Sequence, residues 1–123
     1  MKVVITGGDG FIGKALAAAL SGRGIEVIIV DRKRGIEAKD FFDTAANLHE
    51  ADCVFHLAAQ TSVFNTDKPQ IIRDNIETFI SVCDACRRAN VKLVYASSST
   101  ANSPNKPAAQ VAVMWAVDAW YVK

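Results

Sequence analysis

A glycine-rich turn near the start of the chain has the spacing of a phosphate-binding loop. The segment GDGFIG (residues 8–13) fits the pattern G-x-G-x-x-G, and it lies between an apolar run and a stretch with helical spacing. That context makes the pattern informative. Glycines permit a tight turn and a close approach of phosphate, while the helix N-terminus supplies N–H donors and a positive dipole end. The turn therefore predicts a pyrophosphate site; the alternative is a turn that is rich in glycine for steric reasons only.

An acidic residue, Asp31, ends the next apolar run. A carboxylate at this point accepts hydrogen bonds from the hydroxyls of an adenosine ribose and repels a 2′-phosphate, which favours NAD over NADP. The following segment RKR (Arg32–Arg34) is the opposing signal, because cations can accommodate that phosphate. The alternative for RKR is a solvated turn of mixed charge. We predict NAD as the cofactor.

These residues need a scaffold, and the apolar pattern predicts one. We expect parallel strands within residues 2–5, 25–31, 35–43, 52–59 and 91–97. Helical spacing predicts helices over 11–21 and about 69–90, with one or two helical turns in 44–51. The expected apolar face of the first helix consists of Phe11, Ile12, Ala15, Leu16, Ala19 and Leu20.

Strands that alternate with helices indicate right-handed crossovers. We therefore predict an α/β fold, a Rossmann-like doubly wound parallel sheet of about five strands, in abbreviated form. Sheets of this kind bind ligands at the carboxyl ends of their strands, where the glycine turn and Asp31 stand.

Bulk properties limit the classes of partner and compartment. The chain has 123 residues and a net charge of +1, which fits one domain and argues against nucleic-acid or membrane partners. No apolar run reaches membrane-spanning length, and the N-terminal segment lacks the pattern of a secretory signal. Three cysteines give no disulfide framework. We expect a cytoplasmic protein.

Two motifs are expected to be structural. Cys83 and Cys86 form a C-x-x-C on the apolar face of the predicted helix. We expect both in the core, because reactive thiols of this motif lie at a helix start and no second pair exists for zinc. No metal site is predicted. His56, between Phe55 and Leu57 in a strand, is expected to be a hydrogen-bonded structural histidine.

The last segment differs from the rest. We divide the chain into a domain over 1–106 and an apolar segment over 107–123, whose start at Pro107 suits a first helical turn. A helix that is apolar on nearly every side must be buried. We expect it to pack on the domain or at a dimer interface, so that the chain forms a homo-oligomer. A strand is the alternative, because Val111, Val113, Trp115 and Val117 alternate.

Several motifs in order resemble one family. These are TGGDGFIG (6–13), Asp31, HLAAQTSV (56–63), Pro69 with Asn75, and VKLVYASSS (91–99). They resemble the extended short-chain dehydrogenase/reductases, and most closely the NAD-dependent nucleotide-sugar epimerases and dehydratases, over residues 3–100. The resemblance implies a Rossmann fold and a bound NAD. For the full family it implies reversible oxidation of a sugar hydroxyl, with a nucleotide sugar as further partner.

The resemblance also implies roles for single residues. The resemblance would place Gly7, Gly10 and Gly13 at the pyrophosphate, Asp31 at the ribose, Asp40 and Phe41 near the adenine, and Leu57, Ala58 and Ala59 along the cofactor. The predicted cofactor-binding set also includes Phe11, Ile12, Arg32 and Asn75. Asn75 would support the active-site end of the sheet. Ser98 matches the residue that binds the reacting oxygen of the substrate, with Ser97 one position away.

The family's catalytic tyrosine and lysine do not transfer directly. They lie four residues apart on one helix face, whereas this chain has Tyr121 and Lys123, two residues apart. We carry over no role for the lysine, and Ser98 and Tyr121 are the catalytic candidates. The motif VYG after the serines is replaced by ANS (101–103), and the short link between Asp31 and His56 leaves no room for a normal helix.

Three functions remain open at this point, because the family's sugar-nucleotide domain is also expected to be absent. The first is a minimal NAD-binding domain with little chemistry of its own. The second is an active epimerase, dehydratase or reductase that is completed by an oligomer or another chain. The third is a non-catalytic interaction module that assembles through its apolar tail.

Overall fold

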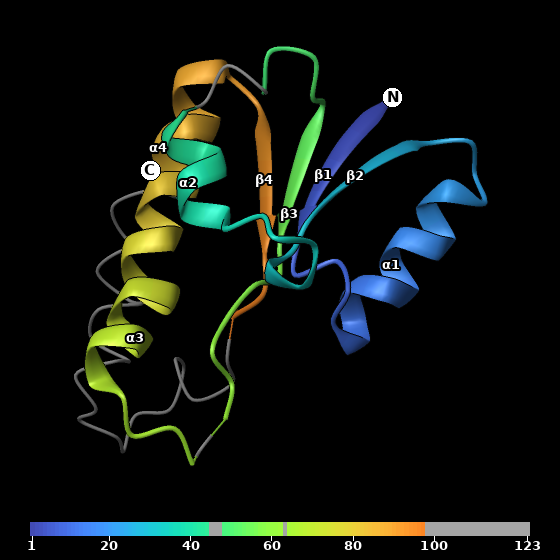
Figure 1. The fold of residues 1–123 in the computed structure, drawn as a ribbon. Coiled ribbons are helices and arrows are strands. Elements are labelled where there is room, and N and C mark those ends of the chain that lie inside the picture. Colours follow the sequence, from blue (N-terminus) through green and yellow to red (C-terminus); the bar gives the residue numbers. More distant parts are fainter. Residues whose placement is uncertain (45–47, 63, 98–123) are drawn as a thin grey trace, which may run out of the picture.

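The structure, a computed structural model, describes residues 1–44, 48–62 and 64–97. Its sheet consists of β1 (Lys2–Thr6), β2 (Glu26–Val30), β3 (Cys53–His56) and β4 (Lys92–Tyr95). The strands are parallel, in the order β2-β1-β3-β4. The carboxyl ends of all four strands therefore meet at one edge, the lower edge in Figure 1.

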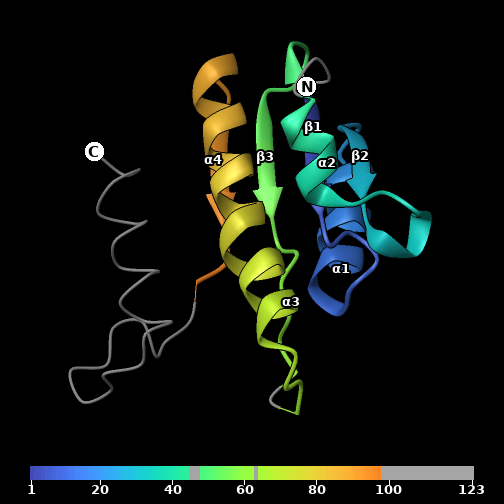
Figure 2. The ribbon, with the colours of Figure 1, turned by 60° about the vertical axis from the view of Figure 1, so that its left-hand side comes forward.

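Helices cover both faces of the sheet (Figures 1 and 2). Helix α1 (Phe11–Ser21) lies on one face, and α2 (Ala38–Asp43) lies on the other beside a long helix. That long helix comprises α3 (Lys68–Ile72), a π-helical turn η3 (Arg73–Glu77) and α4 (Thr78–Ala89). A 3-10 turn, η1 (Arg32–Arg34), follows β2. The arrangement confirms the Rossmann-like doubly wound α/β fold.

The ends of the long helix follow from local chemistry. At its start, the Asp67 side chain accepts a hydrogen bond from the Gln70 N–H at 3.1 Å, and Pro69 stands in the first turn. At its end, Asn90 adopts a left-handed conformation with φ 55°, and the Val91 N–H donates to the Cys86 carbonyl at 2.9 Å. The helix expected over about 69–90 is thus confirmed.

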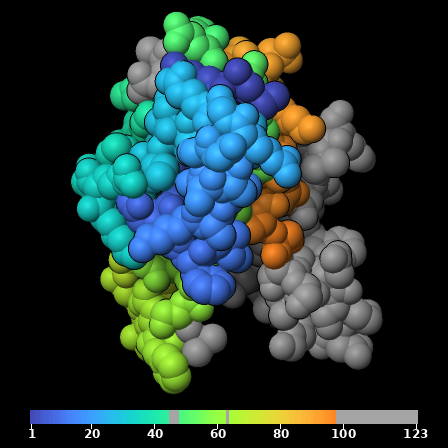
Figure 3. Space-filling model, turned by 90° about the vertical axis from the view of Figure 1, so that its right-hand side faces the viewer, coloured from blue at the N-terminus to red at the C-terminus, as the bar shows by residue number. Residues whose placement is uncertain are grey.

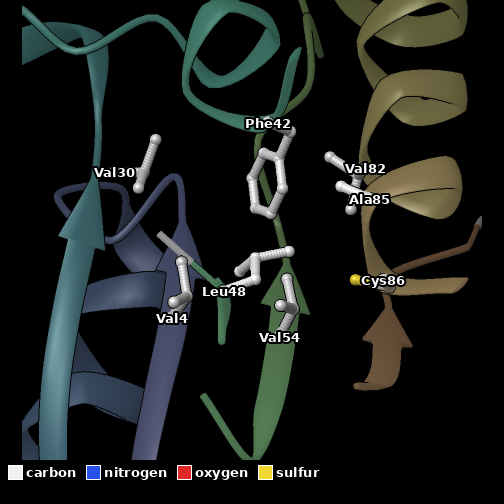
Figure 4. Close-up of a cluster of buried hydrophobic side chains, with 8 residues drawn as sticks. All are labelled: Val4, Val30, Phe42, Leu48, Val54, Val82, Ala85 and Cys86. Carbon is white, nitrogen blue, oxygen red and sulfur yellow. The ribbon is translucent and has the colours of Figure 1, made fainter. Parts of the chain in front are cut away.

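The larger core lies between the sheet and helices α2 and α4 (Figure 4). It joins residues from β1, β2, β3, α2, α4 and the segment before β3: Val4, Val30, Phe42, Leu48, Val54, Val82, Ala85 and Cys86. Cys83 is also buried. The core role predicted for the C-x-x-C motif is confirmed.

The smaller core lies under α1, which occupies the middle of the face shown in Figure 3. Val3 and Ile5 of β1 pack there against Ala17. The predicted apolar face of α1 was partly wrong, because Phe11 is 96% exposed and Ile12 63%. The reason is that the helix rests on the sheet through Gly13 and Ala17, and this orientation turns four of the predicted residues outward: Phe11, Ile12, Ala15 and Ala19.

The strand predicted within residues 35–43 was also wrong, because Ala38–Asp43 forms helix α2. Its fully buried Phe42 packs with Val82 and Ala85 of α4 in the larger core. A strand added beside β2 would leave that ring at the edge of the sheet, whereas a short helix places it over the sheet. The described residues therefore contain four strands rather than five.

Several predictions fall on residues that the structure does not describe. They concern part of the helical turns expected in 44–51, the apolar helix over 107–123 with the expected dimer interface, and the catalytic candidates Ser98 and Tyr121. These remain predictions. Among the described helices, none is long and apolar enough to cross a membrane.

Candidate functional site

The glycine turn joins β1 to α1 at the carboxyl edge of the sheet. Gly7 has φ 68°, a conformation that favours glycine, and its N–H donates to the Val30 carbonyl at 2.9 Å. The Gly10 N–H donates to the Gly7 carbonyl at 3.0 Å. Gly10 is the N-cap of α1 and offers no side chain to the first helical turn. The amide groups of that turn are therefore available to an anion.

The turn also packs tightly against itself and against the segment after β3. A Cβ atom on Gly13 would lie 2.1 Å from the Gly7 carbonyl oxygen, and one on Gly7 would lie 2.9 Å from the Ala58 nitrogen. Both distances are shorter than side chains tolerate. Glycine is thus required at these two positions by contacts within the chain, and the same contacts bring Leu57 and Ala58 beside the turn.

A buried hydrogen-bond network at Thr6 holds the segment after β3 in place. The Thr6 hydroxyl oxygen accepts from the Leu57 and Ala58 N–H groups at 3.1 Å each, and lies 2.7 Å from Nδ1 of His56. Because both oxygen lone pairs are used, the hydroxyl donates its proton to Nδ1. His56 is therefore the neutral Nε2–H tautomer, stacked on Phe79 with 5.6 Å between ring centroids. The structural role expected for His56 is confirmed.

The burial of His56 predicts a pH-dependent stability. His56 is 7% exposed. Burial lowers the pKa of its imidazole to about 4, from an ordinary value near 6.5. Between these values the unfolded chain binds a proton that the folded chain does not, so stability falls as the pH falls. We expect a loss of about 2 kcal/mol from this group between pH 7 and pH 5.

Urea unfolding at several pH values measures this effect. The His56→Gln variant should lose most of the slope between pH 7 and pH 5, whereas His49→Gln, a change at an exposed residue, should retain it. An unchanged slope in His56→Gln would show that another group titrates in this window.

The Asp31 carboxylate connects the end of β2 to the glycine turn. Its Oδ2 atom accepts from the Asp9 N–H at 3.0 Å, and its Oδ1 atom accepts from the Lys33 N–H at 2.9 Å. A carboxylate has about four acceptor positions. Two of them hold the backbone in place, and the other two can accept hydroxyl groups of a ligand that lies along the edge of the sheet.

The three cations after Asp31 are each engaged by groups of the chain. Arg34 contacts both carboxylate oxygens of Asp9, at 2.7 and 2.9 Å, and the Lys33 ammonium donates to the Asp9 carbonyl at 3.3 Å. The hydrogen bond from Arg34 lowers the pKa of the Asp9 carboxyl. Arg32 forms paired contacts with the carboxylates of both Glu37 and Asp74.

The π-helical turn η3 links this region to the segment after β3. Asp74 is 8% exposed and binds Arg32 at 3.0 and 3.2 Å. Burial would raise the pKa of Asp74, but the hydrogen bonds and charge of Arg32 outweigh it, so the pKa lies below its ordinary value. Asn75 accepts from the Gln60 N–H at 2.7 Å and donates to the Gln60 carbonyl at 3.1 Å. Asp74 and Asn75, which are neighbours in the long helix, thus hold the turn η1 and the segment after β3 in place.

The residues expected near an adenine lie on α2. Asp40 is exposed, and Phe41 is half-buried against Phe42 in an edge-to-face contact with 5.1 Å between ring centroids. An open pocket of about 320 Å³ lies between α2 and the long helix, lined by Glu37, Lys39, Asp40, Arg73, Asp74 and Thr78. Arg32, the residue after Asp31, forms ion pairs with two of these residues, Glu37 and Asp74. The pocket therefore lies next to the region around Asp31.

The structure brings most of the predicted set to one edge of the sheet. They belong to the turn from β1 into α1, the segment after β2, the segment after β3 and the turn η3: Gly7, Gly10, Phe11, Ile12, Gly13, Asp31, Arg32, Leu57, Ala58, Ala59 and Asn75. Phe11 and Ile12 add an exposed apolar surface beside the turn. Ser97 is exposed after β4. The sequence did not suggest site roles for Thr6, Asp9, Gln60 and Asp74. Their contacts join segments that are distant in the chain, so no local sequence motif marks them.

The strand order, the glycine turn after β1 and the carboxylate after β2 define a Rossmann-like α/β domain of the nucleotide-binding class. Residues 3–113 match the NAD dependent epimerase/dehydratase family. The chain belongs to this family.

Curated relatives and solved structures agree with this assignment. A UDP-2-acetamido-2,6-beta-L-arabino-hexul-4-ose reductase of Pseudomonas aeruginosa is 33% identical over 110 residues, which is 86% of this chain and 27% of the relative. An ADP-L-glycero-D-manno-heptose-6-epimerase of Alkalilimnicola ehrlichii is 31% identical, over 84% of this chain and 38% of the relative.

Among solved structures, MoeE5 in complex with UDP-glucose and NAD is 32% identical with a TM-score of 0.74, over 84% of this chain and 38% of that one. The Thermus thermophilus UDP-glucose 4-epimerase complex with NAD is 32% identical with a TM-score of 0.66, over 80% and 38%. The chain spans less than half of the length of these proteins.

Proposed function

We propose that this chain binds NAD at the glycine turn. The observation that carries the proposal is the coupling of the turn to Asp31 through the Asp9 N–H at 3.0 Å. Through this bond the start of α1, whose amide groups would bind an anion, lies next to a carboxylate with two acceptor positions that the backbone does not use. Gly7 and Gly13 allow the turn to pack closely against the segment after β3 and against the start of α1, and this packing fixes the amide groups that would face a pyrophosphate.

Each part of the site would hold one part of the dinucleotide. The amide groups at the start of α1 would bind the pyrophosphate, and Asp31 would accept both hydroxyls of the adenosine ribose. Leu57, Ala58 and Ala59 would line the cofactor, and Asn75 would keep their segment in place through its two bonds to Gln60. Asp40 and Phe41 are proposed to lie near the adenine. Bound NAD supplies a hydride acceptor.

We further infer that the chain carries the cofactor-binding part of an enzyme that oxidises or reduces a nucleotide sugar. The family match and the NAD-bound and UDP-sugar-bound structural neighbours support this inference. Ser98 and Tyr121 are the proposed catalytic residues. Nicotinamide absorbance with UDP-glucose tests turnover, and its loss in Ser98→Ala and Tyr121→Phe would support these roles. Full turnover in either variant would exclude that residue.

Removal of the Asp31 carboxylate is expected to weaken NAD binding about tenfold or more, because hydrogen bonds to a charged group are lost. Isothermal titration of NAD into wild type and Asp31→Ala measures this. Asp43→Ala is the control, because it removes a carboxylate that pairs with Lys39 on α2. Circular dichroism verifies that Asp31→Ala is folded. Equal affinities for Asp31→Ala and wild type would contradict the proposed ribose contact.

A further inference from the structure

We propose that Asp9 determines cofactor specificity, because its carboxylate occupies Arg34, a cation that would otherwise bind the 2′-phosphate of NADP. This inference rests on the proposed binding of NAD at the glycine turn. It goes further by assigning to one residue inside the turn the role of an internal anion beside the ribose position.

Asp9 lies directly beside the proposed ribose site. Its N–H donates to Asp31 Oδ2 at 3.0 Å, so its backbone lies directly against the carboxylate that is proposed to bind the ribose. A phosphate on the ribose 2′-oxygen would enter this region. There it would meet the carboxylates of Asp31 and Asp9, and like charges close together disfavour binding.

Two cations, Arg34 and Lys33, contact Asp9. Arg34 makes a bidentate contact with the Asp9 carboxylate at 2.7 and 2.9 Å, and the Lys33 ammonium lies 3.3 Å from the Asp9 carbonyl oxygen. Bidentate contact with an oxyanion is the arrangement by which arginine recognises phosphate. In this structure a carboxylate of the chain takes the place of that phosphate.

The exposure of these groups shows which cations can be released. The Arg34 side chain is 50% exposed and its contact with Asp9 is at the surface. The partners of Arg32 are instead Glu37 and Asp74, and the Asp74 side chain is 8% exposed. Arg32 therefore stays engaged when Asp9 is neutralised. Lys33 keeps its contact with the backbone carbonyl of Asp9, so the cation that becomes available is Arg34.

The Asp9→Asn variant tests the proposal, since it keeps the shape of the side chain and removes its charge. We expect the Kd for NADP to fall about fivefold, as for the gain of one exposed ion pair, and the Kd for NAD to change by less than about twofold. The gain should shrink at high salt. Isothermal titration with each dinucleotide provides both constants, and urea unfolding verifies that the variant is folded.

Two further variants make the test specific. Asp43→Asn causes the same change in net charge on α2, where Asp43 pairs with Lys39 at 2.6 Å, and should leave the NADP to NAD ratio unchanged. Arg34→Gln added to Asp9→Asn should remove most of the gain in NADP affinity. A gain that persists without Arg34 would overturn the assigned role of the Asp9–Arg34 pair.

The outcomes separate this inference from the proposed function. If wild type binds NAD and Asp9→Asn has the same NADP to NAD ratio, the specificity role of Asp9 is wrong and NAD binding stands. If wild type binds neither dinucleotide, both proposals fail. A gain in NADP affinity for Asp9→Asn but not for Asp43→Asn supports the role of Asp9.

Discussion

The Gly13→Ala variant is expected to lose about 4 kcal/mol of unfolding free energy and its affinity for NAD. The new methyl carbon would lie 2.1 Å from the Gly7 carbonyl oxygen and 2.7 Å from the Gly8 Cα atom. Both neighbours are backbone atoms, so the whole turn must move to make room. The same movement would displace the amide groups at the start of α1 that are proposed to bind phosphate.

The matched control is Gly22→Ala at the other end of the same helix. Gly22 has φ −62°, and a methyl group there would approach no atom more closely than 3.3 Å. We expect its unfolding free energy to stay within about 1 kcal/mol of wild type. Urea unfolding and NAD titration of both variants measure the difference. Wild-type stability of Gly13→Ala would show that the turn can move away from α1 at little cost in free energy.

The Thr6→Val variant is expected to lose about 3 kcal/mol, although valine has nearly the same shape as threonine. The Thr6 hydroxyl is fully buried and makes three hydrogen bonds, to the Leu57 N–H, the Ala58 N–H and His56 Nδ1. The Leu57 N–H keeps the Thr6 carbonyl as a second acceptor at 3.2 Å. The Ala58 N–H and the histidine nitrogen lose their partner while buried, and each unsatisfied group costs about 1–3 kcal/mol.

Two variants serve as controls for Thr6→Val. Thr44→Val removes an exposed hydroxyl at the end of α2 and should change the unfolding free energy by about 0.5 kcal/mol or less. Thr6→Ser retains the hydroxyl, so it should keep a larger share of the stability than Thr6→Val. Unfolding curves with equal midpoints for Thr6→Val and wild type would contradict the hydroxyl network inferred around His56.

The secondary structure was predictable where the local pattern is strong. Buried strands appear as short β-branched runs, as in β1, and the long helix is marked by Pro69 near its start and Asn90 at its end. The prediction failed at α2, where Phe41 and Phe42 satisfy a strand or a short helix equally well. It also failed for Phe11 and Ile12, because apolar spacing does not reveal which side of a helix a close glycine contact will bring to the sheet.

The residues of the candidate site also fall into a predictable group and an unpredictable group. The glycine turn and Asp31 were visible because backbone geometry and the position after a strand restrict the residue types that fit. Asn75 was indicated by the family resemblance, but its partner Gln60 was not. The π-helical turn η3, which places Asp74 and Asn75 against two different loops, has no signal in the sequence.

The sequence by itself determined the family, the parallel α/β fold and the glycine turn, because these depend on residue patterns within short segments. Only the tertiary structure decided which charges and hydroxyls meet. The pairs Asp9–Arg34, Arg32–Asp74 and Thr6–His56 join segments 25, 42 and 50 residues apart. Such pairs form when the crossovers bring the strand ends to one edge of the sheet. For that reason the sequence suggested that Arg34 was open to a phosphate, whereas the structure shows it bound to Asp9.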